Sequence, residues 1–254
     1  MLDQAQLIGP PLRIEDTALL FPSFESQLQY SRKVRNIAPA NLIAYWPLWE
    51  ASGSVANDIS GNARHGSYTG VTLGEAGIGD GRTSPYFDGA NDYADMFSAS
   101  LASARSGAEC SVLMWATVAN AGTWTDGESR YTFQWSLDLD NYIRMYKSSA
   151  NGRISFRYKA GGTSESADAN LISNTGWALM GMTVSASGDL AQYFWDGVRI
   201  GTSAGLGAWA GTAATIVFGA SSVAAGSPWH GYLAHCMILN RALTQAEVAT
   251  LAVV

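Results

Sequence analysis

The feature that most constrains this chain is the spacing of its turn signals. From Asn41 onward, short runs rich in aromatic and β-branched side chains alternate with clusters of Gly, Asn, Asp and Ser. This spacing is typical of short strands joined by hairpins. Asp196-Gly197 and Asn151-Gly152 lie between such runs, and these pairs favour the type I′ turn because both of its central residues need positive φ. The pattern predicts an all-β fold, a two-sheet antiparallel sandwich of the jelly-roll type.

The two ends of the chain depart from this pattern. Residues 1–40 contain four of the seven prolines, and we predict an extended N-terminal arm that packs on its own domain or on another chain. Within the arm, Ser23 to Lys33 could form a short helix. At the other end, Thr244-Gln-Ala-Glu247 is a capping box, which predicts a short C-terminal helix. The chain therefore divides into the arm and a sandwich domain, residues 41–254.

Charge and hydropathy exclude several classes of partner. A net charge of −6 argues against nucleic acid, which demands a basic face that displaces counterions. No apolar run approaches the roughly 20 residues that span a bilayer, so we expect no membrane insertion. The opening residues lack the pattern of a secretory signal. Cys110 and Cys236 each lie in an apolar run and are predicted to be buried free thiols.

Signals for catalysis are weak. A glycosidase needs two carboxylates at a defined separation, and residues i and i+2 of a strand share a face. The nearest such pair is Asp138 and Asp140, which precedes a predicted turn at Asn141. No nucleophile elbow, phosphate loop or zinc spacing is present. We expect a protein without enzymatic activity, and a glycosidase built on these two aspartates is a remote alternative.

Aromatic side chains outside the predicted strand alternation are candidates for sugar binding, because their faces stack on the apolar side of pyranose rings. Trp124 and Asp126 share a predicted loop, Trp209 lies among Gly and Ala, and Tyr142 begins a predicted strand. The alternative is that both tryptophans cover the ends of the core. The tryptophans within predicted strands are expected to be core or half-core: Trp46, Trp115, Trp135, Trp177 and Trp195. His235 alternates with its neighbours and is predicted to face outward at the sheet surface.

Four sequence blocks in a fixed order resemble a known family. They are LIAYWPLWEASGSVANDISGNARHG at 42–66, FDGANDY at 87–93, WDGVRIG at 195–201 and WHGYLAHCMILNRALTQAEV at 229–248. Together they resemble the laminin-G-like, concanavalin A-like jelly-roll modules of bacterial, phage and metazoan surface proteins. The resemblance covers residues 41–254 and implies the same sandwich.

The resemblance also implies one structural calcium ion, held by the first block. Asp58 would supply a carboxylate, and Asn62 and His65 would supply oxygen atoms, since calcium prefers hard oxygen ligands. Where related modules carry an acidic pair, this chain reads Ala234-His235, which weakens the case for a metal. The alternative is that Asp58 and Asn62 cap a turn.

Two functions are compatible with these observations. We favour a non-catalytic virion structural protein, such as a phage capsid decoration, head-fibre or tail-attachment protein. It would display the lectin-like sandwich on the virion surface and dock on other virion subunits through residues 1–40. Such a protein would be a homo-oligomer, a trimer or dimer, and could bind a host-surface glycan. The alternative is a secreted or cell-surface carbohydrate-binding module that uses calcium and the loop tryptophans.

Overall fold

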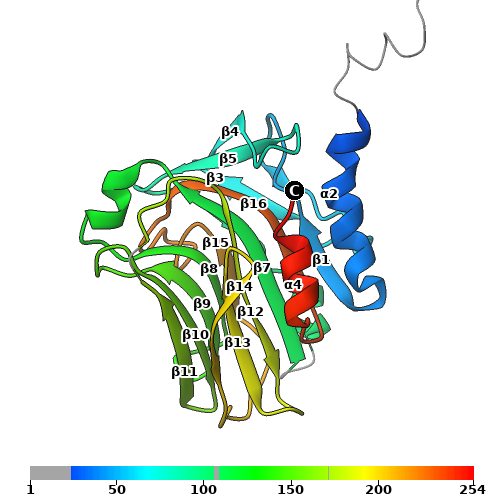
Figure 1. The fold of residues 1–254 in the computed structure, drawn as a ribbon, viewed down its shortest axis with the longest axis vertical. Coiled ribbons are helices and arrows are strands. Elements are labelled where there is room, and N and C mark those ends of the chain that lie inside the picture. Colours follow the sequence, from blue (N-terminus) through cyan, green and yellow to red (C-terminus); the bar gives the residue numbers. More distant parts are fainter. Residues whose placement is uncertain (1–23, 106–108, 171) are drawn as a thin grey trace, which may run out of the picture.

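Two antiparallel eight-stranded sheets pack face to face in the computed structural model, which describes residues 24–105, 109–170 and 172–254 (Figure 1). The first, here the β7 sheet, runs in the order β14 (Val198–Ser203), β13 (Leu190–Trp195), β12 (Ala178–Ser185), β7 (Glu109–Val118), β16 (His230–Leu239), β5 (Thr83–Asp88) and β4 (Thr72–Ala76), and β1 (Leu42–Trp46) also pairs with β16. The second, the β8 sheet, runs β11 (Thr163–Ala169), β10 (Ile154–Ala160), β9 (Tyr142–Lys147), β8 (Arg130–Ser136), β15 (Thr215–Phe218), β6 (Tyr93–Asp95), β3 (Gly66–Thr69) and β2 (Val55–Ala56). The predicted all-β sandwich is confirmed.

The main core fills the space between the sheets. On β9 the period-2 alternation is complete, with Ile143 and Met145 buried and Tyr142, Arg144 and Tyr146 directed away from the core. β7 and β16 differ, because nearly every residue along them is buried. Both faces of these two strands are therefore covered, one by the β8 sheet and the other by helices.

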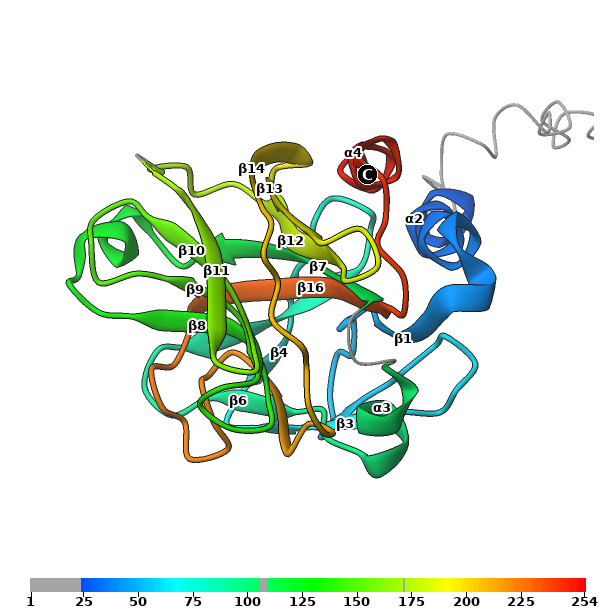
Figure 2. The same ribbon diagram turned by 90° about the horizontal axis from the view of Figure 1, so that it is seen from below.

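Helices α2 (Phe24–Ile37) and α4 (Gln245–Leu251) lie side by side on the outer surface of the β7 sheet (Figures 1 and 2). Tyr30 and Val34, one helical turn apart, are buried in a second apolar cluster with Trp115 of β7 and Leu251 of α4. Residues 24–37 form a helix, so this part of the arm is not extended, and the short helix considered for Ser23 to Lys33 is confirmed. Its apolar face packs on its own sandwich, one of the two partners considered for the arm. The remainder of the predicted arm, residues 1–23, lies outside the described residues.

Local turn and cap chemistry follows the sequence closely. Asp196 and Gly197 have φ of 52° and 71° between β13 and β14, as a type I′ hairpin requires. Thr244 accepts a hydrogen bond from the backbone N–H of Glu247, and the Glu247 carboxylate accepts one from the N–H of Thr244, which completes the predicted capping box. The remaining short helices are α3 (Ala99–Ala104) and the 3₁₀ turns Pro39–Asn41 and Ala121–Thr125. None of the helices in the described residues combines the length and apolarity needed to cross a bilayer.

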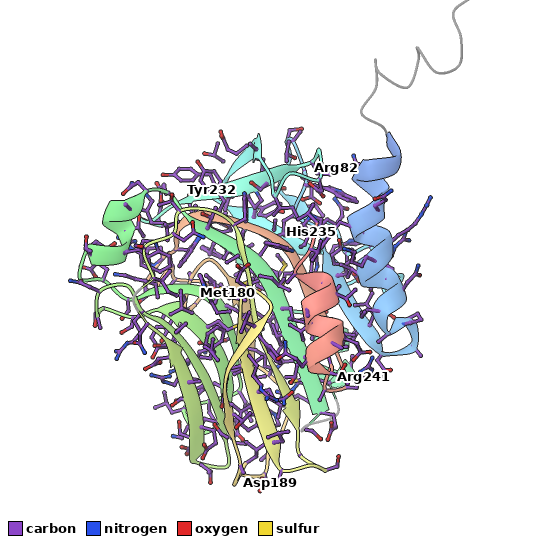
Figure 3. All side chains as sticks on the ribbon, viewed as in Figure 1. Arg82, Met180, Asp189, Tyr232, His235 and Arg241 are labelled. Carbon is purple, nitrogen blue, oxygen red and sulfur yellow. The ribbon has the colours of Figure 1, made fainter. Side chains whose placement is uncertain are left out.

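His235 points away from the main core, as predicted, but it is only 2% exposed. The outer surface is covered there by α2, whose Tyr30 ring lies 4.7 Å from the imidazole (Figure 3). Its Nε2 lies 3.0 Å from Asp80 Oδ2, and its Nδ1 lies 2.7 Å from the hydroxyl of Tyr45. The predicted exposure is wrong because the sequence did not reveal that this helix packs over the strand. Cys110 and Cys236 are buried free thiols, as predicted.

Candidate functional site

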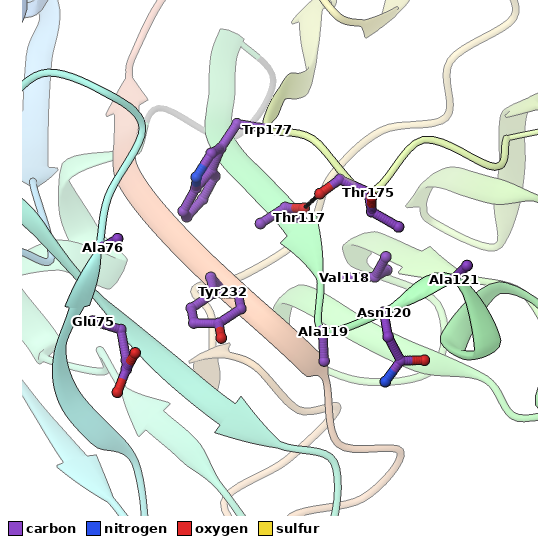
Figure 4. A pocket seen from close by; sticks show the side chains of 10 residues that line it. All are labelled: Glu75, Ala76, Thr117, Val118, Ala119, Asn120, Ala121, Thr175, Trp177 and Tyr232. Atoms are coloured by element: carbon purple, nitrogen blue, oxygen red, sulfur yellow. Dashed lines mark hydrogen bonds between the residues drawn. The ribbon is translucent and has the colours of Figure 1, made fainter.

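A groove of about 560 Å³ opens on the outer side of the β7 sheet, and no residue of α2 or α4 lines it (Figure 4). Its walls come from four separate parts of the chain. These are β4, the end of β7 with the segment that follows it, the segment before β12, and the start of β16; they contribute Glu75, Ala76, Thr117, Val118, Ala119, Asn120, Ala121, Thr175, Trp177 and Tyr232.

Two aromatic rings, those of Trp177 and Tyr232, line this groove, and the Tyr86 ring packs beside that of Tyr232. The Tyr232 ring lies between Tyr86 of β5, at a centroid distance of 5.0 Å, and Trp177, at 6.3 Å. All three side chains are half-buried, so part of each ring remains open to solvent. Tilted rings in a row offer apolar faces on which the C–H side of a sugar ring can stack.

Polar side chains flank the rings. Figure 4 shows Glu75 on one side of Tyr232 and Asn120 on the other, and both are exposed. The Asn120 side chain makes no capping hydrogen bond to the 3₁₀ turn that it precedes. The Thr117 hydroxyl, in contrast, donates to the carbonyl of Thr175 at 2.7 Å, which ties the segment before β12 to β7. The groove thus offers one carboxylate and one amide to a ligand.

The local sequence explains why β16 approaches β7 so closely here. A Cβ atom on Gly231 would lie 2.1 Å from the carbonyl oxygen of Thr117, so only glycine fits between the two strands. The next residue, Tyr232, is then placed directly opposite Thr117 and beside Tyr86. Sequence reasoning missed this site, although the outward register of Tyr86 and Tyr232 on their strands was an available signal.

His230 connects Tyr86, the ring beside Tyr232, to the 3₁₀ turn at Ala121–Thr125. Its Nε2 lies 3.2 Å from the Tyr86 hydroxyl, and its Nδ1 lies 3.2 Å from the hydroxyl of Thr123 in the 3₁₀ turn. Burial lowers the pKa of His230, and the nearby Arg130 lowers it further. The imidazole is therefore neutral at pH 7, with one nitrogen donating and the other accepting.

The predicted binding residues near the 3₁₀ turn are engaged within the protein. Trp124 is 3% exposed, and its Nε1 donates to the carbonyl of Asn174 at 3.0 Å. It covers the end of the core, which was the alternative considered for it. Asp126 forms ion pairs with Arg130 and with the fully buried Lys147, each at 2.5 Å.

Trp209 and Tyr142 lie near each other at the opposite end of β8. The guanidinium of Arg105 lies 3.9 Å from the ring centroid of Trp209, and that of Arg144 lies 3.7 Å from that of Tyr142. Asn141, next to Tyr142, accepts a hydrogen bond from the N–H following Trp209. The four predicted ligand-binding residues therefore form two separate pairs and not one site.

Asp58, Asn62 and His65 do share one loop, as the calcium prediction requires. However, the buried Asp58 carboxylate accepts four hydrogen bonds, from the backbone N–H groups of Tyr45, Ser60 and Arg64 and from the Ser60 hydroxyl. A carboxylate has about four lone-pair positions, so all of them are used. No group of three or more His, Cys, Asp or Glu side chains within the described ranges is arranged to hold a metal. As arranged, the loop does not fit a calcium ion, and its geometry is that of a capped turn.

Comparisons with known proteins agree with this fold. Residues 88–249 match the sequence model of the concanavalin A-like lectin/glucanases superfamily. The structure is similar to the binding domain of Paraclostridial Mosquitocidal Protein 1, with a TM-score of 0.63, 16% identity and coverage of 84% of this chain and 52% of that one. It is also similar to domain 4 of AbnA, a GH43 extracellular arabinanase from Geobacillus stearothermophilus solved in complex with arabinotriose, with a TM-score of 0.63, 18% identity, and coverage of 84% and 98%.

The binding domain of botulinum neurotoxin serotype D is similar too, with a TM-score of 0.62, 12% identity, and coverage of 84% of this chain and 52% of that one. The chain thus spans about half the length of the two toxin binding domains. At these identities the likeness is one of fold. No curated protein sequence matches the chain significantly.

Proposed function

Because the chain belongs to the concanavalin A-like lectin/glucanases superfamily, we propose that it is a lectin-like domain that binds a neutral glycan in the groove around Tyr232 and Trp177. The observation that carries the proposal is the pair of half-buried rings that line the groove, Tyr232 and Trp177, with Tyr86 packed beside Tyr232. The exposed carboxylate of Glu75 and amide of Asn120 flank them (Figure 4).

This combination matches the chemistry of a sugar. Its C–H faces stack on aromatic rings, and its hydroxyls need acceptors and donors, which Glu75 and Asn120 supply. Glu75 would repel a carboxylate or sulfate, and for this reason we assign a neutral ligand to the groove. Arabinotriose, the ligand solved with the related arabinanase domain, is a suitable first probe.

The proposed activity is binding without catalysis. Glu75 is the one carboxylate among the residues that line the groove, whereas glycoside hydrolysis uses a pair. Asp138 and Asp140, the pair considered from the sequence, lie in an exposed turn. Asp138 accepts hydrogen bonds from the Asp140 N–H and the Asn141 amide, and Asp140 pairs with Lys159 at 2.8 Å.

For location, we propose the cell exterior or cell surface, where glycans are displayed; the related arabinanase is itself extracellular. The virion role, the docking of residues 1–40 on other subunits and the dimer or trimer remain predictions. Part of their support was an arm suited to lying along a partner subunit, and α2 packs instead on its own sandwich. This packing favours the carbohydrate-binding alternative.

Titration calorimetry against a panel of neutral oligosaccharides that includes arabinotriose tests the proposal. Trp177→Ala and Tyr232→Ala should each weaken binding at least about tenfold, or ~1.4 kcal/mol. Asn120→Ala removes an exposed amide and should weaken binding without affecting the fold. Trp209→Ala, at the far end of the β8 sheet, is the matched control. Absence of binding to the whole panel at high protein concentration, or an unchanged affinity in Trp177→Ala, would refute the proposal.

A further inference from the structure

The outer face of the β8 sheet carries a cluster of tyrosine and arginine side chains that the groove does not use. Alternation along β9 and β10 directs their members away from the core, and a register shift in β8 between Tyr131 and Phe133 places both Tyr131 and Gln134 on this same face. Helices α2 and α4 pack on the other sheet (Figure 2). We call this cluster the tyrosine–arginine face, and its members are Tyr131, Gln134, Tyr142, Arg144, Tyr146 and Arg157.

Two arginines lie directly opposite each other in the centre of this face. Arg144 of β9 pairs in register with Arg157 of β10, and like charges in directly opposite positions destabilise a sheet. Arg157 is neutralised by Asp168, whose carboxylate lies 2.9 Å from its Nη1. Arg144 stacks on Tyr142 and forms no ion pair with a described residue, and its buried Nε has no hydrogen-bond partner. One cation of the opposed pair is therefore uncompensated.

A second unsatisfied group lies beside the first. Gln134 of β8 is the register partner of Arg144 on its other side, and it is only 3% exposed. Its side-chain oxygen makes no hydrogen bond within the described chain. Buried polar atoms in folded proteins are nearly always paired. Two adjacent residues on this face, the half-buried Arg144 and the buried Gln134, have polar atoms without a partner, which indicates hydrogen bonds that a ligand completes.

Aromatic rings flank these groups on both sides. Tyr131 and Tyr146 stack in parallel across β8 and β9, with centroids 4.8 Å apart and planes 12° from parallel. Tyr142 lies on the other side of Arg144, along the same strand. The face therefore combines a guanidinium without an ion-pair partner among the described residues, an amide and stacking surfaces.

We propose that the tyrosine–arginine face is a second binding site, which takes an acidic sugar through its anionic group. Arg144 binds the anion, Gln134 completes the hydrogen bonding, and the tyrosine rings hold the adjoining sugar rings. A neutral sugar would leave the Arg144 charge uncompensated, so the anion is what this face selects. The anion can be a carboxylate or a sulfate, because a guanidinium forms paired hydrogen bonds with either.

The test compares three probes on the intact protein: trigalacturonic acid, its neutral methyl ester, and a sulfated trisaccharide. We expect the acid to bind and the ester to bind at least about tenfold more weakly, with affinity for the acid falling as salt is raised. Preference for the sulfated probe would support the site and identify its anion as sulfate. Equal affinity for acid and ester, or no binding of either anionic probe, would overturn the proposal.

Arg144→Gln should lower affinity for the acid at least tenfold, while Arg199→Gln, which changes an exposed arginine on β14, should leave it unchanged. Arg144→Gln is expected to fold, because it removes a like-charge contact with Arg157, and its melting temperature should equal or exceed that of the unmodified protein. Binding of neutral oligosaccharides in the groove should be unaffected by this variant. An unchanged affinity for the acid in Arg144→Gln would refute the assignment of Arg144.

Discussion

Replacing Tyr30 by phenylalanine removes one hydroxyl that joins three parts of the molecule. This hydroxyl donates to the carbonyl of Leu251 in α4 at 2.8 Å and accepts from Nε1 of Trp115 in β7 at 2.6 Å. Burial raises the pKa of Tyr30, so the phenol stays neutral and keeps its proton for the carbonyl. Phenylalanine fills the same space, and the loss is therefore confined to two buried polar groups left without partners. At about 1–3 kcal/mol for each, reduced by local relaxation, we expect a fall of about 2–4 kcal/mol in the free energy of unfolding.

Urea unfolding followed by tryptophan fluorescence measures this difference. Tyr93→Phe is the matched control, because Tyr93 is a half-exposed residue of β6, and its change should stay within about 0.5 kcal/mol. The slope of the free energy of unfolding against urea concentration should be equal in both variants, since the surface exposed on unfolding is the same. If Tyr30→Phe is no less stable than Tyr93→Phe, the packing of α2 on its own sandwich is refuted, and another chain becomes the expected partner of residues 24–37.

Two further outcomes follow from other buried groups. Burial lowers the pKa of His235 more than Asp80 raises it. From about pH 6.5 downward the unfolded chain therefore binds a proton that the folded chain does not. The free energy of unfolding should then fall by up to about 1.4 kcal/mol for each pH unit that the pH is lowered. Urea unfolding at several pH values should show that the free energy of unfolding changes less with pH in His235→Gln than in the unmodified protein. An equal pH dependence in the two proteins would contradict this explanation. Because four hydrogen bonds occupy the Asp58 carboxylate, neither calcium nor a chelator should change the melting temperature. A calcium-dependent rise that Asp58→Asn abolishes would show that the loop rearranges around the ion.

The features that could be predicted from the sequence are those whose partners lie a few residues away. The Asp196-Gly197 turn and the Thr244–Glu247 capping box are complete within four residues, and both form as expected. The alternation on single strands is equally local. The succession of predicted strands and hairpin turns along the chain was enough to indicate the sandwich.

The candidate site is different, because its chemistry depends on segments that meet only in the fold. Glu75, Trp177 and Tyr232 are far apart in the chain, and nothing near Trp177 indicates that its ring is left half-open. Trp124 illustrates the same dependence: its surroundings fit a loop tip or a cover over the core equally well, and only the fold shows that the 3₁₀ turn buries the ring.

The pairing of β1 with β16 also affects how this protein is made. Tyr45 and His235, which contact each other across these strands, are 190 residues apart in the chain. At a synthesis rate of roughly 5–20 residues per second, β1 and α2 leave the ribosome about 10–40 s before the strand and helix that they pack against. During that interval Tyr30 and Val34 lack the part of their partner surface that β16 and α4 supply, and they are open to nascent-chain chaperones. Although α2 is the first helix of the described chain, we expect it to be among the last elements to complete its packing on the sheet.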